Sequence, residues 1–277
     1  MLEIFREAAH LIESGRRGAL ATIISTQGST PGKETAKLLI RDDGSTLGTV
    51  GGGCSEAEVW RLAMEVIATD EPRRMSFRLT AATAAETGLL CGGSFEVFIE
   101  PIGNPVVYIF GAGHCARSLA RTLAPLEYGI VVIDDRESYA APQFFPPQTR
   151  TLVREFESCF ADLSIGPSSY IIIVTRGHQH DECVLEQAVR TPARYVGLIG
   201  SRGKIGAICK NLARRGVRPE QLDHVRAPIG LDIGSRTPDE IAIAIAAEII
   251  AFRRGLAPEP RIPLRARKSA PVEASSS

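Results

Sequence analysis

The stretch "VVYIFGAGHCARSLARTLAPLEYGIVVIDDR", residues 106–136, decides the fold of this chain. It begins with an unbroken apolar run, which predicts a strand buried on both faces. The turn "GAG" then opens a segment with helical spacing, and a second apolar run ends in Asp134. Strand, glycine turn, helix and strand in this order form one βαβ unit of a parallel sheet.

Two later segments, residues 169–190 and 193–216, repeat the order of apolar strand, turn and helix. A last helix is expected to begin after Thr237, a typical N-cap residue, with Pro238 at its first position. These repeats predict a Rossmann-like, doubly wound parallel sheet over residues 103–255.

Residues 1–102 follow a different pattern. An amphipathic helix comes first, and a strand-like run and a hairpin signal at Asp43-Gly44 follow it. A helix after Gly53 and two further strands complete a small α+β module. Residues 256–277 mix proline, arginine, alanine and serine, and we expect a disordered tail there. The predicted fold class is α/β, with this N-terminal module joined to a Rossmann-like domain.

The balance of charges argues against the broad basic surface that nucleic-acid binding requires. The chain carries 32 Lys and Arg and 32 Asp and Glu, so its formal net charge is zero. No apolar run reaches the roughly 18 residues of a membrane span, and no signal peptide is visible. The six cysteines include no CxxC pair, which argues against a disulfide framework or a structural zinc site. We expect a cytoplasmic protein with reduced thiols and no nucleic-acid or membrane partner.

The glycine turn of the opening stretch is a candidate nucleotide site. Gly111 allows the tight turn, and Gly113 lets a pyrophosphate approach the start of the helix. Asp134 ends the next strand, where it could accept hydrogen bonds from ribose hydroxyls. The alternative is that an α/β fold needs this tight turn for its own sake and binds nothing there.

Two further turns follow the carboxyl ends of later strands, where such sheets bind their ligands. They place these polar residues near Gly113 and His114: His178, His180, Asp181, Ser201, Arg202 and Lys204. Arg202 and Lys204 begin a helix and are interpreted as clamps for an anion. His178, His180 and Asp181 could instead ligate a metal, although His180 and Asp181 are adjacent and need not point the same way. A solvated surface without a ligand is the remaining alternative.

Two motifs in the N-terminal module each set a cysteine beside glycines. They are "GTVGGGCSEAEVW", residues 48–60, and "ETGLLCGGSFEVFIEP", residues 86–101. The first places Cys54 at the start of a helix, where free N–H groups and the helix dipole favour an anion and a thiolate. Taken alone, each cysteine is more typical of a small buried or half-buried residue than of a reactive one. Their recurrence in one small module favours a binding role.

With these elements in order, the sequence resembles the XdhC/CoxI family, accessory proteins for xanthine dehydrogenase and related molybdenum hydroxylases. The resemblance extends from about residue 20 to residue 252 through eight segments in the family's order. The segments are "QGSTPGK", "GTVGGGCSEAEV", "GLLCGGSFEVFIEP", "YIFGAGHCARSLA", "VIDDR", "VTRGHQHDECVL", "YVGLIGSRGKI" and "APIGLDIGSRTPDEIAIAIAAEII".

The resemblance implies a protein that binds the molybdenum cofactor, shields it while its terminal sulfur ligand is installed, and delivers it to an apo-hydroxylase. It also implies a cysteine desulfurase as a partner. The implied cofactor-binding residues are Gly51, Gly52, Gly53, Cys54 and Glu56 in the first motif, Cys91, Gly92 and Gly93 in the second, and Gly111, Gly113 and His114 in the glycine turn. Of the two thiols, Cys91 is the one expected to contact the metal or its sulfur ligand.

The segment "GSTPGKETAKLLI", residues 28–40, departs from the family pattern. Many members carry an arginine after the proline, a glycine before "AK" and a methionine after it, and here these places hold Gly32, Thr35 and Leu38. Loss of the arginine weakens any prediction that this loop binds an anion.

Two other functions fit the same residues. An NAD(P)-dependent oxidoreductase would use the turn from Gly111 to Gly113, with Asp134 favouring NAD over NADP. A pure interaction module would dock the hydroxylase and leave the loops unused. We also expect self-association to a homodimer.

Overall fold

The computed structural model describes residues 1–30, 32–78 and 93–256. The predicted tail at 256–277 therefore lies almost wholly outside the described residues, and so do Cys91 and Gly92. The helices are α1 Leu2–Glu13, α2 Gly53–Thr69, α4 His114–Leu123, α5 His178–Ala188, α6 Arg202–Arg214, α7 Pro219–Leu222 and α8 Pro238–Arg253. The strands are β1 Gly18–Gln27, β2 Lys37–Arg41, β3 Thr46–Gly48, β4 Arg73–Arg78, β5 Ser94–Ile102, β6 Val106–Phe110, β7 Gly129–Asp134, β8 Thr149–Val153, β9 Tyr170–Ile173, β10 Tyr195–Leu198 and β11 Val225–Arg226.

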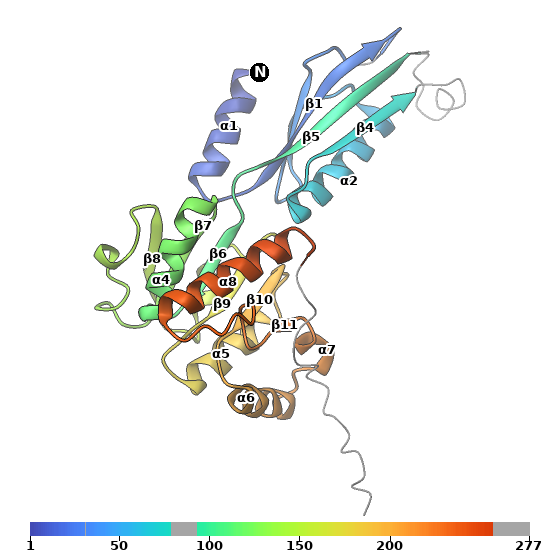
Figure 1. Cartoon of the computed structure of the whole chain (residues 1–277). Coiled ribbons are helices and arrows are strands. Elements are labelled where there is room, and N and C mark those ends of the chain that lie inside the picture. Colours follow the sequence, from blue (N-terminus) through green and yellow to red (C-terminus); the bar gives the residue numbers. More distant parts are fainter. Residues whose placement is uncertain (31, 79–92, 257–277) are drawn as a thin grey trace, which may run out of the picture.

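The front module, residues 1–102, is built on a five-stranded antiparallel sheet in the order β3-β2-β1-β5-β4. Side chains on successive residues of β1 point to opposite faces: Ala19 and Ala21 pack under α2, and Leu20 packs under α1. Figure 1 shows the two helices on opposite sides of this sheet. The alternation of apolar residues explains why both faces of the sheet are covered.

The second sheet has six parallel strands in the order β11-β10-β9-β6-β7-β8. Counted along the chain, this is the strand order of a Rossmann fold, with its reversal between β6 and β9. Val107 and Ile109 pack with α4 and α8, and Tyr108 and Phe110 pack with α5 and α6 on the other face. The predicted fold class is confirmed.

Both predicted features of the last helix are present. Thr237 accepts a hydrogen bond from the Glu240 N–H, and the Glu240 side chain accepts from the Thr237 N–H, with Pro238 at the first helical position. This is a capping box, which satisfies donors at the helix start that would otherwise have no partner. It fixes where α8 begins, beside the carboxyl edge of the parallel sheet.

The amino edge of the parallel sheet faces the front module. A cavity of about 360 Å³ lies between them, lined by Arg17 and Ile67 on one side and by Val106 and residues 163–169 on the other. Val106 begins β6 and Ser169 immediately precedes β9, so the strands begin at this joint and run away from it (Figure 1). Their carboxyl edge is at the opposite end of the Rossmann domain.

Candidate functional site

The glycine turn after β6 is shaped partly by the chain itself. Gly111 has φ +106°, and a Cβ there would meet the Val174 carbonyl oxygen at 2.5 Å. Gly113 is different, because φ is −73° and a Cβ would meet nothing within 4 Å. The first glycine is therefore required by close packing against the end of β9. The second leaves open space at the N-terminus of α4, where a phosphate group can approach.

Asp134 has a different role from the one predicted. Its side chain is 1% exposed, and its Oδ2 accepts a hydrogen bond of 2.8 Å from the Ala112 N–H inside the glycine turn. Oδ1 accepts from the N–H and the Nε of Arg136 at 3.0 and 2.8 Å. The carboxylate is an internal support of the turn, and not the exposed ribose acceptor that its position suggested.

The residues predicted after β9 and β10 do gather near this edge. Asp181 is fully buried and accepts a hydrogen bond of 2.6 Å from Thr175 Oγ1. Lys204 Nζ lies 2.5 Å from Asp181 Oδ2, a contact of opposite charges without the angle of a hydrogen bond. Ser201 caps α6 by accepting from the Lys204 N–H, which sets the start of that helix. His178 is exposed at the start of α5.

A metal centre at His178, His180 and Asp181 is contradicted by the geometry. His180 packs edge-on against the Phe156 ring, with centroids 5.3 Å apart, and Asp181 is held by Thr175 and Lys204. Across residues 1–30, 32–78 and 93–256, no group of three His, Cys, Asp or Glu side chains is placed to hold a metal ion.

Two arginines at the carboxyl edge were not among the predicted site residues. Arg136 follows β7, and its guanidinium carbon lies over the Tyr139 ring, 3.7 Å from the ring centroid. Arg176 follows β9 and forms a bidentate ion pair with Asp135, with Nη2 and Oδ2 2.7 Å apart. Both stand directly beside motifs singled out for other residues, so the signal that was missed is their position after β7 and β9, the two strands that flank β6.

An open hollow of about 440 Å³ lies beside the start of α4 and is lined in part by His114, Arg117 and Phe144. The Arg117 guanidinium lies 3.8 Å from the centroid of the Phe144 ring. Arg121 and Asp239 also line the hollow and pair with each other, so Arg117 leaves it with a net positive charge beside an aromatic wall, which suits a planar or anionic ligand.

The first glycine–cysteine motif forms a loop that Glu56 holds together. Its Oε2 accepts hydrogen bonds from Thr49 Oγ1, the Val50 N–H and the Gly52 N–H at 2.6, 3.2 and 3.1 Å. Gly51, Gly52 and Gly53 all have positive φ, between 70° and 123°. These left-handed conformations are ones that glycine adopts without strain, so the loop depends on glycine and on Glu56.

Cys54 is exposed on this loop, and the positions of a Cβ on Gly52 and Gly53 are open. Its thiol is therefore accessible to a ligand. In the second motif, glycine is required at position 93 by close packing. A Cβ on Gly93 would meet the Gln27 and Ser29 carbonyl oxygens at 2.4 and 2.5 Å. The predicted metal contact at Cys91 and the neighbouring Gly92 lie outside the described residues.

Gly32, one of the departures from the family pattern, is also tightly packed. A Cβ there would meet Ile23 Cδ1 at 2.4 Å and the Val50 carbonyl oxygen at 2.6 Å. The loop after β1 therefore lies directly against the chain that leads into the glycine–cysteine motif.

The glycine–cysteine motif at the start of α2 lies far from the space beside Gly113 at the carboxyl edge of the parallel sheet, which we call the Rossmann crevice. The C-terminus of α2 is at the joint, where Arg194 Nη1 donates to the Ala68 and Thr69 carbonyl oxygens at 3.2 and 2.8 Å. Its N-terminus, with Cys54, is a helix length of about 25 Å away. Because the crevice is on the far edge of the parallel sheet, one small ligand cannot contact both within one chain (Figure 1).

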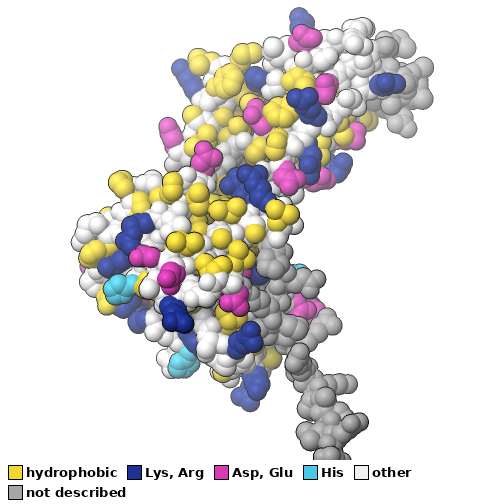
Figure 2. All heavy atoms as spheres, in the orientation of Figure 1, with side chains coloured by type: hydrophobic (Ala, Val, Ile, Leu, Met, Phe, Trp, Pro, Cys, Tyr) yellow, Lys and Arg dark blue, Asp and Glu magenta, His cyan; other side chains and the backbone are white. Residues whose placement is uncertain are grey.

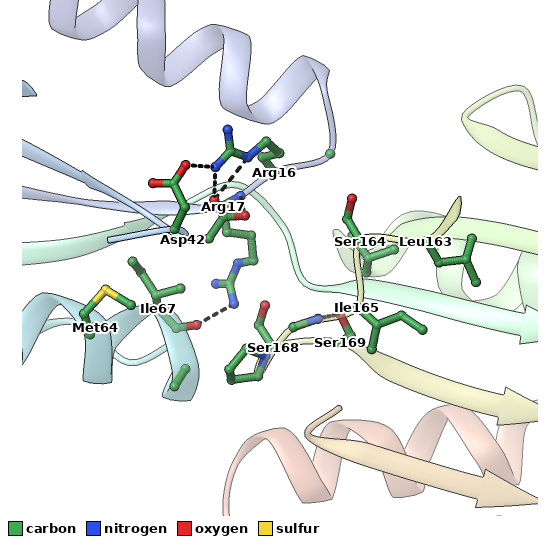
Figure 3. A pocket seen from close by; sticks show the side chains of 16 residues that line it. Arg16, Arg17, Asp42, Met64, Ile67, Leu163, Ser164, Ile165, Ser168 and Ser169 are labelled. Atoms are coloured by element: carbon green, nitrogen blue, oxygen red, sulfur yellow. Dashed lines mark hydrogen bonds and ion pairs between the residues drawn. The ribbon is translucent and has the colours of Figure 1, made fainter. Parts of the chain in front are cut away.

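The cavity at the joint contains none of the predicted site residues (Figure 3). Its charged side chains already have partners. Arg16 pairs with Asp42 and Asp43, and Arg17 donates to the Ile67 carbonyl oxygen at 2.8 Å and pairs with Asp70. We interpret this cavity as a packing gap between the ends of the two sheets.

Fold and site define a protein with a Rossmann domain whose carboxyl edge carries paired cations and carboxylates, joined to a module that presents an exposed thiol beside a glycine loop. The family profile described as the XdhC Rossmann domain matches residues 107–249, and the profile of the XdhC and CoxI family matches residues 11–78. The chain belongs to the XdhC family, which confirms the resemblance found in the sequence.

Curated relatives agree with this assignment. The uncharacterized protein YqeB of Escherichia coli K12 is 35% identical over 254 residues, which are 91% of this chain and 46% of YqeB. A Bacillus subtilis protein described as a probable xanthine dehydrogenase subunit is 29% identical over 159 residues, 57% of this chain and 46% of that protein. This chain spans about half the length of these two relatives.

The molybdenum cofactor insertion chaperone PaoD of Escherichia coli K12 is similar over nearly its whole length. It is 21% identical over 280 residues, covering 90% of this chain and 88% of PaoD. A crystal structure described as a xanthine dehydrogenase from Bacillus halodurans has 21% identity and a TM-score of 0.50, over 97% of this chain and 98% of that one. At this identity the structure supports the fold alone.

No helix within the described parts of the chain is long and apolar enough to cross a membrane. Figure 2 shows one face of the molecule, on which acidic and basic side chains are interspersed rather than gathered into areas of one sign.

Proposed function

We propose that this chain is a molybdenum cofactor chaperone for a xanthine dehydrogenase-type hydroxylase. Its front module would bind the cofactor, protect it while the terminal sulfur ligand is installed, and release it to the apo-enzyme. The observation that carries this proposal is the exposed Cys54 thiol beside the open positions of Gly52 and Gly53. Membership of the XdhC family and similarity to a cofactor insertion chaperone support it.

The residues of the front loop suit this cargo. A thiolate is a soft ligand, which favours a molybdenum centre over hard cations such as magnesium. The start of α2 presents backbone N–H groups of the kind that bind phosphate. Glu56 holds the loop and acts as a positioning residue for Cys54. We retain Cys91 as the proposed contact to the metal or its sulfur ligand.

The Rossmann crevice is proposed to hold a separate, phosphate-bearing nucleotide. Its distance from the front loop excludes one cofactor that spans both within a chain. The open Gly113, the exposed His114 and the cations Lys204 and Arg117 support an anionic ligand. An NAD-type ligand whose ribose hydroxyls bind Asp134 is not supported, because the Asp134 carboxylate is buried.

The proposed partners are the apo-hydroxylase, a cysteine desulfurase and a second copy of this chain. For self-association, Ile243 and Ile250 are 55% and 41% exposed and stand seven residues apart on α8, so they share one face of that helix. Light scattering of the I243E/I250E variant tests the dimer. We expect the wild-type mass to be halved by the substitutions, and a monomeric wild type would contradict the dimer.

Anaerobic purification from cells that synthesise the cofactor tests the main proposal. We expect pterin and molybdenum to approach one per chain in the wild type and to fall at least about tenfold in C54S and C91S. The control is C183S, which changes a half-buried thiol on α5. A cofactor content near zero in the wild type, or equal content in all four proteins, would contradict the proposal. Mass spectrometry of the same samples identifies the crevice ligand.

A further inference from the structure

Three cations at the carboxyl edge, after β7, β9 and β10, each contact a carboxylate. Arg136 pairs with Asp134, Arg176 with Asp135, and Lys204 with Asp181, and Arg136 Nε also lies 3.8 Å from Asp135 Oδ1. The first pair lies within one segment. The third has its acid fully buried. Only Arg176 and Asp135 come from segments on opposite sides of the glycine turn.

The ion pair between Arg176 and Asp135 crosses the end of β6. In the sheet, β6 lies between β7 and β9, so the ends of β7 and β9 are about 10 Å apart. Asp135 immediately follows β7, and Arg176 follows β9 by three residues. A contact between them must span the position where β6 leads into Gly111–Gly113. The pair therefore ties together the two loops that flank the proposed phosphate-binding turn.

The burial of the two partners differs. The Asp135 side chain is 12% exposed, whereas the Arg176 side chain is 38% exposed. The carboxylate is thus sheltered against the loop, and the guanidinium faces outward. A guanidinium has five N–H donors in a planar fork, of which a bidentate carboxylate takes two. Phosphate has the same geometry of paired acceptor oxygens, so it can take the place of the carboxylate.

The chemistry around the pair favours an anion over a neutral diol. Asp134, the acid in the position for ribose recognition, is fully engaged with Ala112 and Arg136. Gly113 leaves open space at the N-terminus of α4, where the helix dipole favours negative charge. Arg176 reaches across the end of β6 from the β9 side to contact Asp135.

We propose that Arg176 is an anion-binding residue of the crevice, and that Asp135 competes with the ligand's phosphate for its guanidinium. Binding of the phosphate exchanges one bidentate partner of Arg176 for another and releases the tie across the turn. Asp135 therefore sets the affinity of the crevice and selects ligands whose charge is high enough to displace a carboxylate. This inference rests on the proposed presence of a phosphate-bearing ligand in the crevice.

Isothermal titration with inorganic pyrophosphate, at fixed ionic strength, tests the competition. We expect D135N to lower the dissociation constant about tenfold and R176Q to raise it about tenfold. The double variant D135N/R176Q should match R176Q within about twofold if Asp135 acts through its bidentate partner Arg176, and not through Arg136, whose Nε lies 3.8 Å from Asp135 Oδ1. The control is E186Q, which removes a carboxylate of similar exposure (16%) from an ion pair on α5 and should leave the constant unchanged. Circular dichroism verifies that each variant is folded.

Three results would overturn the competition. If D135N tightens pyrophosphate binding equally with and without Arg176, the effect comes from the loss of a negative charge near the site, and not from competition for the Arg176 guanidinium. If D135N leaves binding unchanged or weakens it, the two groups do not compete. If neither the wild type nor D135N binds pyrophosphate, Arg176 is not an anion site. A G113L variant separates this inference from the proposed crevice site: loss of binding in G113L, with no effect at Arg176 or Asp135, would retain the site and reject the competition.

Discussion

Asp70 and Arg253 are 183 residues apart in sequence, and they form an ion pair that joins the front module to the Rossmann domain, with Arg253 Nε and Asp70 Oδ2 2.7 Å apart. Asp70 lies at the end of α2 and Arg253 at the end of α8. The other oxygen of Asp70 pairs with Arg17, whose side chain is 4% exposed. Burial lowers the pKa of Arg17, and the charge of Asp70 opposes that shift.

Replacement of Asp70 by alanine should destabilise the protein strongly. The change leaves the buried Arg17 without its counter-charge, and breaking a buried pair in this way costs about 3–5 kcal/mol. Urea unfolding followed by circular dichroism measures the loss. E65A is the matched control, because Glu65 pairs with Arg61 on an exposed surface and should cost no more than about 1 kcal/mol. Equal losses in the two variants would show that the joint does not depend on Asp70.

Glu56 should control the order of the glycine–cysteine loop. Its Oε2 accepts from Thr49, Val50 and Gly52, so E56A leaves those donors without a partner and should cost about 2 kcal/mol. Hydrogen exchange of the Val50 and Gly52 amides measures the effect directly. Glu58, an exposed residue on the same helix, provides the control E58A, which should leave both amides protected. Protection unchanged in E56A would contradict the assigned role.

The two glycines of the Rossmann turn should respond differently to alanine. G111A places a Cβ 2.5 Å from the Val174 carbonyl oxygen at φ +106°, and we expect a loss of about 3 kcal/mol or more. G113A meets open space at φ −73° and should change stability by no more than about 1 kcal/mol. Thermal unfolding of both variants checks this contrast, and a reversed order would refute the packing described for the turn.

The pair between Asp135 and Arg176 should stabilise the protein at neutral pH and fail in acid. The Arg176 guanidinium lowers the pKa of Asp135 from 3.8 to about 2. A carboxyl group whose pKa is lowered by folding stabilises the folded state fully at pH values above 3.8, its pKa in the unfolded chain. This stabilisation is lost as the pH falls toward 2. The difference in unfolding free energy between wild type and D135N should therefore shrink as the pH falls below about 4.

The matched control for this pH series is D162N, which removes the acid of the exposed pair with Arg154. We expect its difference from wild type to be small at neutral pH. If the difference in unfolding free energy between wild type and D135N stays constant or grows as the solution is acidified, the ion pair is not the source of this stability.

Among the five cysteines in the described residues, Cys54 should react first with a thiol reagent. It is exposed, whereas Cys159 is buried and desolvation raises the pKa of its thiol to about 12. Because the thiolate is the reactive form, Cys159 should remain unmodified until the protein unfolds. Peptide mass spectrometry after brief labelling of the native protein measures the order. Early modification of Cys159 would show that the chain opens around it.

Local sequence patterns were sufficient to predict the fold class and the places of the glycine-rich turns, but they did not predict β8, α7 or β11. The run before Gly111 predicted β6 because strands buried on both faces carry consecutive apolar residues, and Thr237 predicted the start of α8 because a hydroxyl satisfies a free N–H. The same reasoning placed Cys54 at the start of α2. Each of these signals depends on neighbouring residues along the chain.

Only the tertiary structure decided what the polar side chains do. Asp134 supports the turn because Ala112 and Arg136 fold around it, and Arg176 pairs with Asp135 because β7 and β9 flank the same strand. The tertiary structure also separated the motif at Cys54 from the crevice at Gly113, because the Rossmann sheet meets the front module at its amino edge. Charge pairing and burial depend on groups distant in sequence, so the spacing of residues along the chain does not specify them.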